Sequence, residues 1–344
     1  DHSSLRGARR RQEPSEAPGP LFEGCLPPSS DEHRRLTVTD LITFLKAPVR
    51  HLLVRRLGIR LEQDESAVLD REPLVLDALQ RWSVAAPLLA LATDGDNASD
   101  WLEKSYQSVQ RRGVLPLGVP GQCTFEEIRS LVEVVAGVVS AEQENLGGVV
   151  DPMPVDLVLT DGRLSGTLNP LRERGILQAT WSKVSAKHML EAWVLHLVQS
   201  VVLGSRPTVL IGRHPREPGA LHCSFKPVPD AEHRLSLLVR MYWRGWEGPL
   251  PFFPRTALRF VRNGGDPNQP QNLDQAISRS QWEWNGRFGE MQDPYVARVY
   301  AGQDPLDATW EWKALGTPAL GFHKYAAFVF QPLIDALEEK AVKA

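Results

Sequence analysis

Cysteine is scarce in this chain, and its scarcity argues against several kinds of site. The 344 residues include three cysteines, Cys25, Cys123 and Cys223, which are far apart and form no CxxC pair. An odd number of scattered cysteines argues against a disulfide framework and against a zinc or iron–sulfur site. We therefore expect no cofactor and no metal, and a protein of the reducing cytoplasm.

Long apolar runs are also missing. A helix that crosses a bilayer needs roughly 20 consecutive apolar residues, and no stretch of the chain offers them. The chain opens on Asp1, in a polar, arginine-bearing segment that lacks the apolar core of a signal peptide and an initiator Met. We expect no membrane partner and a piece of a longer protein.

Charge of one sign is not in large excess. The formal net charge is -3 at pH 7, and 42% of the residues are hydrophobic. The hydrophobic fraction is ordinary for a protein with one or two sizeable cores. Because the chain as a whole is no polycation, any contact with nucleic acid has to come from local patches.

The N-terminal half divides into a tail and a helical layer. Residues 1–36 are rich in Pro, Ser, Arg and Glu and lack periodic apolar positions, which predicts a linker or tail. The RGARRR run within it can touch phosphate or simply be solvated. Residues 37–150 show apolar residues at helical spacing. We predict helices here at 37–47, 48–57, 73–93, 100–112 and 125–143. Thr39–Asp40 is the start signal of the first of them.

The pattern changes at Pro152 to alternating apolar residues, which predicts strands. Two strands flank an Asp161–Gly162 hairpin turn. The remaining elements are predicted as a strand at 175–181, a helix at 185–203 and strands at 207–212 and 220–226. This order predicts an α/β fold of the restriction-endonuclease-like (PD-(D/E)XK) class, a mixed central sheet flanked by helices. We assign 151–344 to this nuclease-like domain and expect 37–344 to form one structural unit with the added helical layer.

Nucleases of that class place an Asp near the end of one strand and an (Asp/Glu)-x-Lys on the next. The carboxylates bind magnesium, and the Lys stabilises developing charge. Here the matching positions are Asn169, Gln178 and Thr180. Two amides and a hydroxyl hold a divalent ion poorly and leave no general base, so we predict a degenerate centre with no catalytic residue.

Other polar residues leave alternatives open. An active metal-dependent nuclease could use Asp156, Glu173 or Lys183 in displaced roles. Asp156 and Asp161 could form a carboxylate pair, although Asp161 precedes a turn glycine and Asp156 is expected to face away from the apolar side of its strand. A further set lies on one helix and could be half a metal site or the polar edge of a packed helix: His188, Glu191 and His196.

Arginines and tryptophans supply the candidates for DNA or partner contact. Guanidinium groups bind phosphate oxygens, and single-stranded bases stack on aromatic rings. The same residue types dominate subunit interfaces and cores, so docking or packing explains them equally well. The candidates are Arg50, Arg55, Arg56, Arg244, Arg255, Trp243, Trp246 and Trp284.

Several separated stretches resemble the C-terminal region of the RecC family, the gamma subunit of bacterial exodeoxyribonuclease V. Together these stretches cover nearly the whole chain, and their order and spacing are specific. They are LPPSS at Leu26–Ser30, TDLITFLKAPVRHLLVRRLGI at Thr39–Ile59, EPLVLDALQRW at Glu72–Trp82, EGPLPFFPRTAL at Glu247–Leu258, and GEMQDPYVARVY with PLDATWE within Gly289–Glu311.

The resemblance implies structural help rather than chemistry. RecC-type subunits join a RecB-like nuclease–helicase and a RecD-like helicase, help to split duplex DNA and guide single strands in recombinational repair. By this resemblance, residues 1–36 follow a helicase-like region. Related nucleases often carry an iron–sulfur Cys where this chain has Ala47, so the resemblance implies no cluster here. A protein-interaction module without DNA contact stays an alternative.

Overall fold

The computed structural model describes residues 21–22, 25–28, 35–61, 76–93, 101–307 and 320–343. The chain divides into two compact units that interleave along the sequence. Unit 1 comprises residues 1–28, 47–61 and 243–328, and unit 2 comprises residues 29–46, 62–242 and 329–344. The RGARRR run and most of the predicted tail lie outside the described residues, as do two further tryptophans, Trp310 and Trp312.

The first sheet of unit 2 is built on the predicted hairpin. β2 (Met153–Leu159) and β3 (Gly162–Leu168) pair antiparallel, with Asp156 opposite Ser165 and Leu157 opposite Leu164. A short strand that the sequence pattern did not predict, β1 (Arg35–Thr37), runs parallel to β3. Val155, Leu159 and Leu164 are buried while Asp156 is exposed, as period-two alternation requires.

The second sheet of unit 2 has the order β4-β5-β6-β7. Its strands are β4 (Ile176–Lys183), β5 (Thr208–Arg213), β6 (Gly219–Phe225) and β7 (Leu337–Lys343). β4 and β5 are parallel, and the other neighbours are antiparallel, so the sheet is mixed. The expectation of one central sheet is wrong: β3 and β4 do not pair, and the strands form two sheets flanked by helices.

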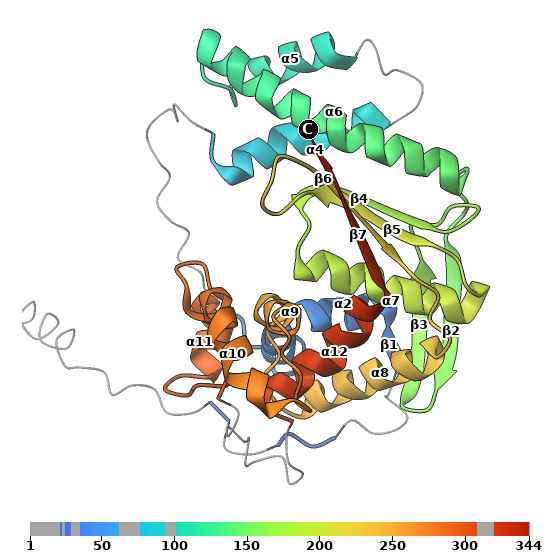
Figure 1. Ribbon diagram of the computed structural model, residues 1–344, viewed down its shortest axis with the longest axis vertical. Coiled ribbons are helices and arrows are strands. Elements are labelled where there is room, and N and C mark those ends of the chain that lie inside the picture. The colour runs from blue at the N-terminus through green and yellow to red at the C-terminus, as the bar shows by residue number, and fades with distance from the viewer. Residues whose placement is uncertain are drawn as a thin grey trace, which may run out of the picture. The chain divides into compact units, whose positions relative to one another are not determined.

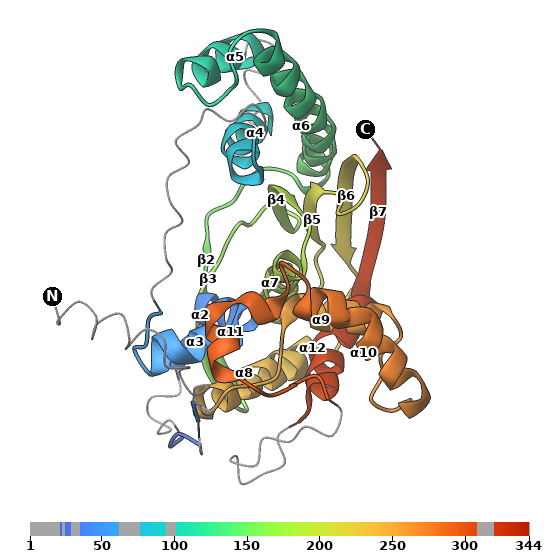
Figure 2. The same ribbon diagram turned by 90° about the vertical axis from the view of Figure 1, so that its left-hand side faces the viewer.

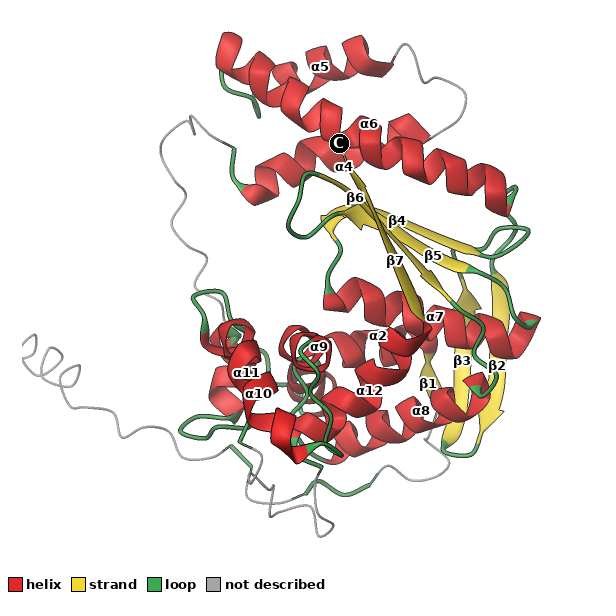
Figure 3. Cartoon of the chain, viewed as in Figure 1, coloured by secondary structure: helices red, strands yellow, loops and turns green. Residues whose placement is uncertain are grey.

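Helices cover both faces of the four-stranded sheet (Figure 1). α4 (Ala78–Thr93) and α6 (Val119–Leu146) pack on one face, where their apolar residues join Leu177, Trp181 and Val209 in one core. α7 (Ala186–Leu203) packs against β5 on the other face, and α2 (Val38–Lys46) packs against α7. α5 (Trp101–Arg111) completes the helical layer, which Figure 3 shows in red beside the yellow strands.

Unit 1 is helical. Its helices are α3 (Pro48–His51) with the π-helical turn η2 (Leu52–Arg56), α9 (Pro254–Arg262), α10 (Pro270–Asn285), the 3-10 turn η3 (Glu290–Gln292) and α11 (Pro294–Val299). α8 (Ala231–Glu247) and α12 (Phe322–Ala336) contribute residues to both units. Figure 2 shows α9 beside α10. Phe253 is at the centre of its core, 4.4 Å from Trp284 and 6.1 Å from Phe322 between ring centroids.

Local signals set the helix ends. The predicted Thr39–Asp40 start is off by two residues, because Thr37 accepts a hydrogen bond from the Asp40 N–H at 3.0 Å and donates its own hydroxyl to the Asp40 carboxylate. This reciprocal pair is a capping arrangement at the start of α2. Within the described part of the chain, no helix is long and apolar enough to cross a membrane.

Candidate functional site

Gln178 and Thr180 lie on one face of β4, as the spacing of two residues requires. Leu177 and Trp181 on the opposite face belong to the core shared with α4 and α6. Gln178 and Thr180 therefore face the side of the sheet on which α7 packs. The strand presents the two predicted positions together, and they carry an amide and a hydroxyl.

The amide and the hydroxyl differ in their hydrogen bonding. The Oε1 atom of Gln178 is buried and accepts no hydrogen bond from the described residues. Thr180 Oγ1 accepts the Ser182 N–H at 3.1 Å and so is used within its own strand. A buried carbonyl oxygen is a weak ligand compared with a carboxylate, because it brings no net charge to offset the desolvation of a divalent ion.

Asn169 is exposed and follows β3 directly, so it belongs to the end of the three-stranded sheet. Gln178 and Thr180 belong to the other sheet of the same unit. Among the described residues, no hydrogen bond joins Asn169 to either of them. Convergence of these three residues in one cleft therefore stays a prediction.

Two carboxylates that could replace the missing acids, Asp156 and Asp161, are engaged by arginines. Both oxygens of Asp156 accept hydrogen bonds from the Arg163 guanidinium across the β2–β3 pair. These bonds lower the pKa of Asp156 below its ordinary value. Asp161 accepts hydrogen bonds from Arg240 at 2.9 Å and from Ser236 at 3.0 Å. Neither carboxylate is therefore left unpaired as a ligand for a metal ion.

The two remaining displaced candidates lie in different surroundings. The Glu173 side chain is packed against the backbone of Gly147 and Gly148, where an added Cβ on Gly147 would lie 2.3 Å from its Oε2 atom. Lys183 is exposed at the end of β4 and lines a pocket. In the described part of the chain, no group of three or more His, Cys, Asp or Glu side chains is arranged to hold a metal ion.

The histidines of α7 have structural partners. His188 caps the helix through Ser185, whose backbone N–H donates to the imidazole Nδ1 at 3.2 Å. Glu191 forms an ion pair with Lys46 of α2. His196 is fully buried, and its two ring nitrogens lie 3.1 Å from the Thr208 hydroxyl and 3.1 Å from the Lys226 carbonyl oxygen. Burial lowers the pKa of His196 and favours its neutral form.

The arginines predicted on the second helix contact aromatic rings. The Arg50 guanidinium lies 5.4 Å from the centre of the Tyr295 ring, and that of Arg56 lies 5.5 Å from the Trp246 ring. Arg55 is exposed. Arg56 also donates to the Pro27 carbonyl oxygen at 3.2 Å. Stacking orients a guanidinium without using all of its N–H groups, so these residues stay candidates for a phosphate or a partner carboxylate.

The two predicted arginines of the C-terminal half are placed differently. Arg244 is exposed on α8. Arg255 lies in the first turn of α9, and its guanidinium donates to the Phe288 carbonyl oxygen at 2.6 Å. Its backbone N–H donates to the Glu290 carboxylate at 3.1 Å. Arg255 thus ties α9 to the segment that follows α10.

The predicted tryptophans lie mostly in the core. Trp243 is 8% exposed and Trp284 is 4% exposed, and Trp246 is half-buried with its ring 6.5 Å from that of Trp243. Their burial favours packing within unit 1 over stacking on bases. The large exposed aromatic side chains of this unit are instead Trp282, at 77%, and Phe288, at 78%, among its described residues.

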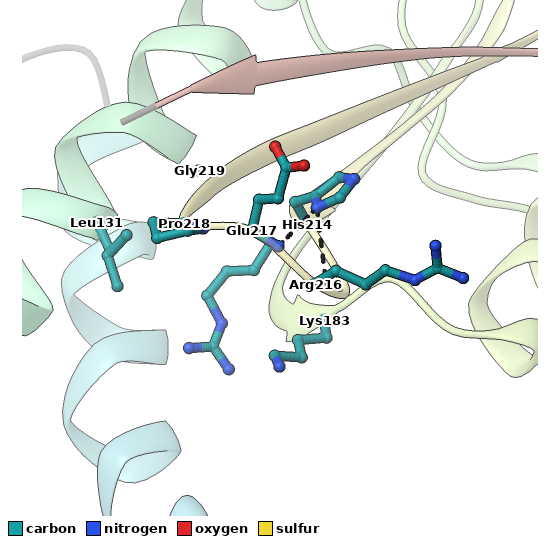
Figure 4. Close-up of a pocket in the computed structure, with 8 residues that line it drawn as sticks. Leu131, Lys183, His214, Arg216, Glu217, Pro218 and Gly219 are labelled. Carbon is teal, nitrogen blue, oxygen red and sulfur yellow. Dashed lines mark hydrogen bonds between the residues drawn. The ribbon is translucent and has the colours of Figure 1, made fainter.

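One group of polar residues escaped the sequence analysis. The turn between β5 and β6 carries His214, Arg216 and Glu217, and with Lys183 and Arg213 they line a pocket of about 230 Å³ (Figure 4). The signal was present as the RHPREPG run between two predicted strands. The proximity of Lys183 to this turn comes from the pairing of β4 with β5, which sequence alone does not give.

Fold and site together define an α/β protein with two helix-flanked sheets, whose predicted metal-binding strand positions carry neutral side chains. The model of the RecC C-terminal domain family matches residues 33–265, and the chain belongs to this family. It is 31% identical over 313 residues, 88% of its length, to the RecBCD enzyme subunit RecC of Mycobacterium tuberculosis. It is 25% identical over 234 residues, 67% of its length, to the RecC subunit of Escherichia coli. These matches cover 26% and 20% of the two relatives, so the chain spans about a quarter or less of their length.

Proposed function

We propose that this chain is a non-catalytic DNA-handling and scaffold domain of a RecC-type subunit of exodeoxyribonuclease V. It would act in the cytoplasm with RecB-like and RecD-like partners during the unwinding and processing of broken DNA ends. The observation that carries the proposal is the match to the RecC C-terminal domain family, together with the neutral side chains of Asn169, Gln178 and Thr180 at the predicted ligand positions (the predicted neutral centre). The restriction-endonuclease-like ancestry of the fold is part of the same proposal.

The chemistry of the neutral centre supports the absence of catalysis. Phosphodiester hydrolysis assisted by a metal needs anionic ligands to seat the ion and to lower the pKa of its water. Asn169, Gln178 and Thr180 bring no charge, and Asp156 and Asp161 are held by arginines. What the domain offers DNA is therefore contact through cations and rigid surfaces, without bond cleavage.

A cleavage and binding assay on a forked duplex tests this function. With magnesium present, the purified chain should leave the DNA uncut and should bind it more weakly as salt rises, because phosphate contacts release counterions. The variant Asn169→Ala should behave like the wild type in both measurements. Robust cleavage that Asn169→Ala abolishes would favour the active nuclease. A lack of binding even at low salt would favour a module that contacts proteins alone.

A further inference from the structure

We propose that the basic pocket, lined by Lys183, Arg213, His214 and Arg216, binds a phosphate group of a DNA strand. The pocket has a volume of about 230 Å³ and lies where β4 and β5 end, beside the turn into β6. Leu131 of α6 forms its apolar wall. The proposal rests on the proposed function for its choice of DNA as the source of the phosphate.

Strand pairing brings the two central cations together. Lys183, the last residue of β4, is the register partner of Arg213, the last residue of β5. The Arg213 guanidinium lies 4.7 Å from the centre of the Trp181 ring, and Trp181 is 3% exposed. A buried ring beneath the guanidinium fixes its plane, so the pocket holds a preorganised donor next to a flexible ammonium.

The positive charge of the pocket is not compensated within the described part of the chain. No ion pair there joins Lys183, Arg213 or Arg216 to an acid, and Arg213 Nε is buried without a hydrogen-bond acceptor. Burial, with a smaller contribution from nearby Arg81, lowers the pKa of Arg213. Both observations show that the surroundings of the Arg213 guanidinium lack an anion. Because a buried charge is stable only when it is paired, an anion bound in the pocket would stabilise it.

The one acid on the pocket wall does not fill this role. In Figure 4 the Glu217 carboxylate points away from Lys183. His214 Nδ1 accepts the backbone N–H groups of Glu217 at 2.9 Å and Arg216 at 3.3 Å, which folds the turn.

A phosphate is the anion that the Arg213 guanidinium and the Lys183 ammonium fit. Guanidinium groups bind phosphate oxygens in bidentate fashion, and an ammonium beside them supplies a point charge. A phosphodiester presents such oxygens at regular intervals along a strand, so one pocket can hold the backbone without reading sequence. We therefore expect the pocket to take part in sequence-independent binding.

Salt-dependent binding of a single-stranded oligonucleotide tests the pocket. Log affinity is measured against log salt for the 344-residue chain, for Lys183→Gln and for Lys183→Gln/Arg213→Gln. Each phosphate contact on a single strand contributes about 0.7 to the slope. The single variant should lower the slope by about 0.7 and the double variant by about 1.4. Lys183 is exposed, so its variant keeps the test valid even if the double variant does not fold.

Matched controls separate this site from bulk charge. Arg111→Gln/Arg112→Gln removes two exposed cations at the end of α5 and should leave the slope at its wild-type value. An oligonucleotide with neutral methylphosphonate linkages should bind the wild type and the pocket variants equally. Equal slopes for the wild type and both pocket variants on the natural oligonucleotide would overturn the proposal.

Two other outcomes identify what has failed. If inorganic phosphate raises the melting temperature of the wild type but not of Lys183→Gln, while the DNA slopes are equal, the pocket takes free phosphate and the DNA assignment is wrong. If the wild type itself shows no salt-dependent binding to DNA, the proposed DNA-handling function fails together with the pocket's role in it.

Discussion

Replacement of Trp193 by alanine is expected to lower the free energy of unfolding of unit 2 by about 4 kcal/mol. Trp193 is 2% exposed on α7, and its ring lies 5.7 Å from Phe225 and 5.9 Å from His196. The substitution removes the indole from the packing between α7 and the four-stranded sheet and leaves a cavity there. Urea unfolding followed by hydrogen exchange in β5 and β6 measures the loss.

Two comparison variants decide whether this loss comes from packing. Trp193→Phe keeps an aromatic ring in the site and should cost less than half as much, since it leaves a smaller cavity. Trp282→Ala removes a ring that is 77% exposed and should change stability by about 0.5 kcal/mol or less. A loss for Trp193→Ala no larger than that for Trp282→Ala would show that the described core does not hold unit 2 together.

Replacement of Glu290 by alanine is expected to destabilise unit 1 by about 3 kcal/mol. The Glu290 carboxylate accepts hydrogen bonds from the Arg255 N–H at 3.1 Å, the Thr256 N–H at 2.8 Å and the Thr256 hydroxyl at 2.8 Å. These two N–H groups belong to the first turn of α9, which begins at Pro254 and has no side-chain cap of its own. The alanine leaves them without an acceptor. Thermal unfolding measures the effect, and Gln292→Ala on the exposed side of η3 is the matched control.

The same carboxylate gives a pH dependence of defined sign. Burial raises the pKa of Glu290 above its ordinary value of 4.5, against the opposing effect of the hydrogen bonds from Thr256 and Arg255. The folded state then binds more protons than the unfolded state, so this contribution to stability is complete below pH 4.5 and is lost as pH rises through the raised pKa. Glu290→Gln does not titrate. The wild type should therefore lose stability relative to Glu290→Gln across this window, and a constant difference between the two would contradict the assignment.

Elements encoded by local pattern were predictable from the sequence. The hairpin of β2 and β3 has apolar residues at every second position, and this pattern predicts both strands. The turn is Thr160–Asp161, one residue before the predicted Asp161–Gly162. α7 was likewise predicted, from Ser185 to Leu203, because its apolar residues recur over five turns bounded by a cap and Gly204. The RecC family was recognised from dispersed stretches and is confirmed by the family match.

Features that depend on distant pairing were not predictable. β7 has the sequence LEEKAVK, whose charged residues do not look like a strand, yet it pairs with β6 along its whole length. Charged side chains suit the open edge of a sheet, where they oppose pairing with another chain. The separation of β3 and β4 into two sheets and the meeting of Lys183 with Arg213 are also set by register, which composition and period do not contain.

Calorimetric titration with manganese is the most direct test of the claim that this chain lost the charges of a nuclease centre. The wild type should give no saturable heat of a specific site, because Asn169, Gln178 and Thr180 offer no anionic ligand. The triple variant Asn169→Asp/Gln178→Glu/Thr180→Lys restores the acid, acid and ammonium pattern and should gain one saturable site. A saturable site in the wild type that is removed by Asp156→Asn or by Glu173→Gln would contradict the account.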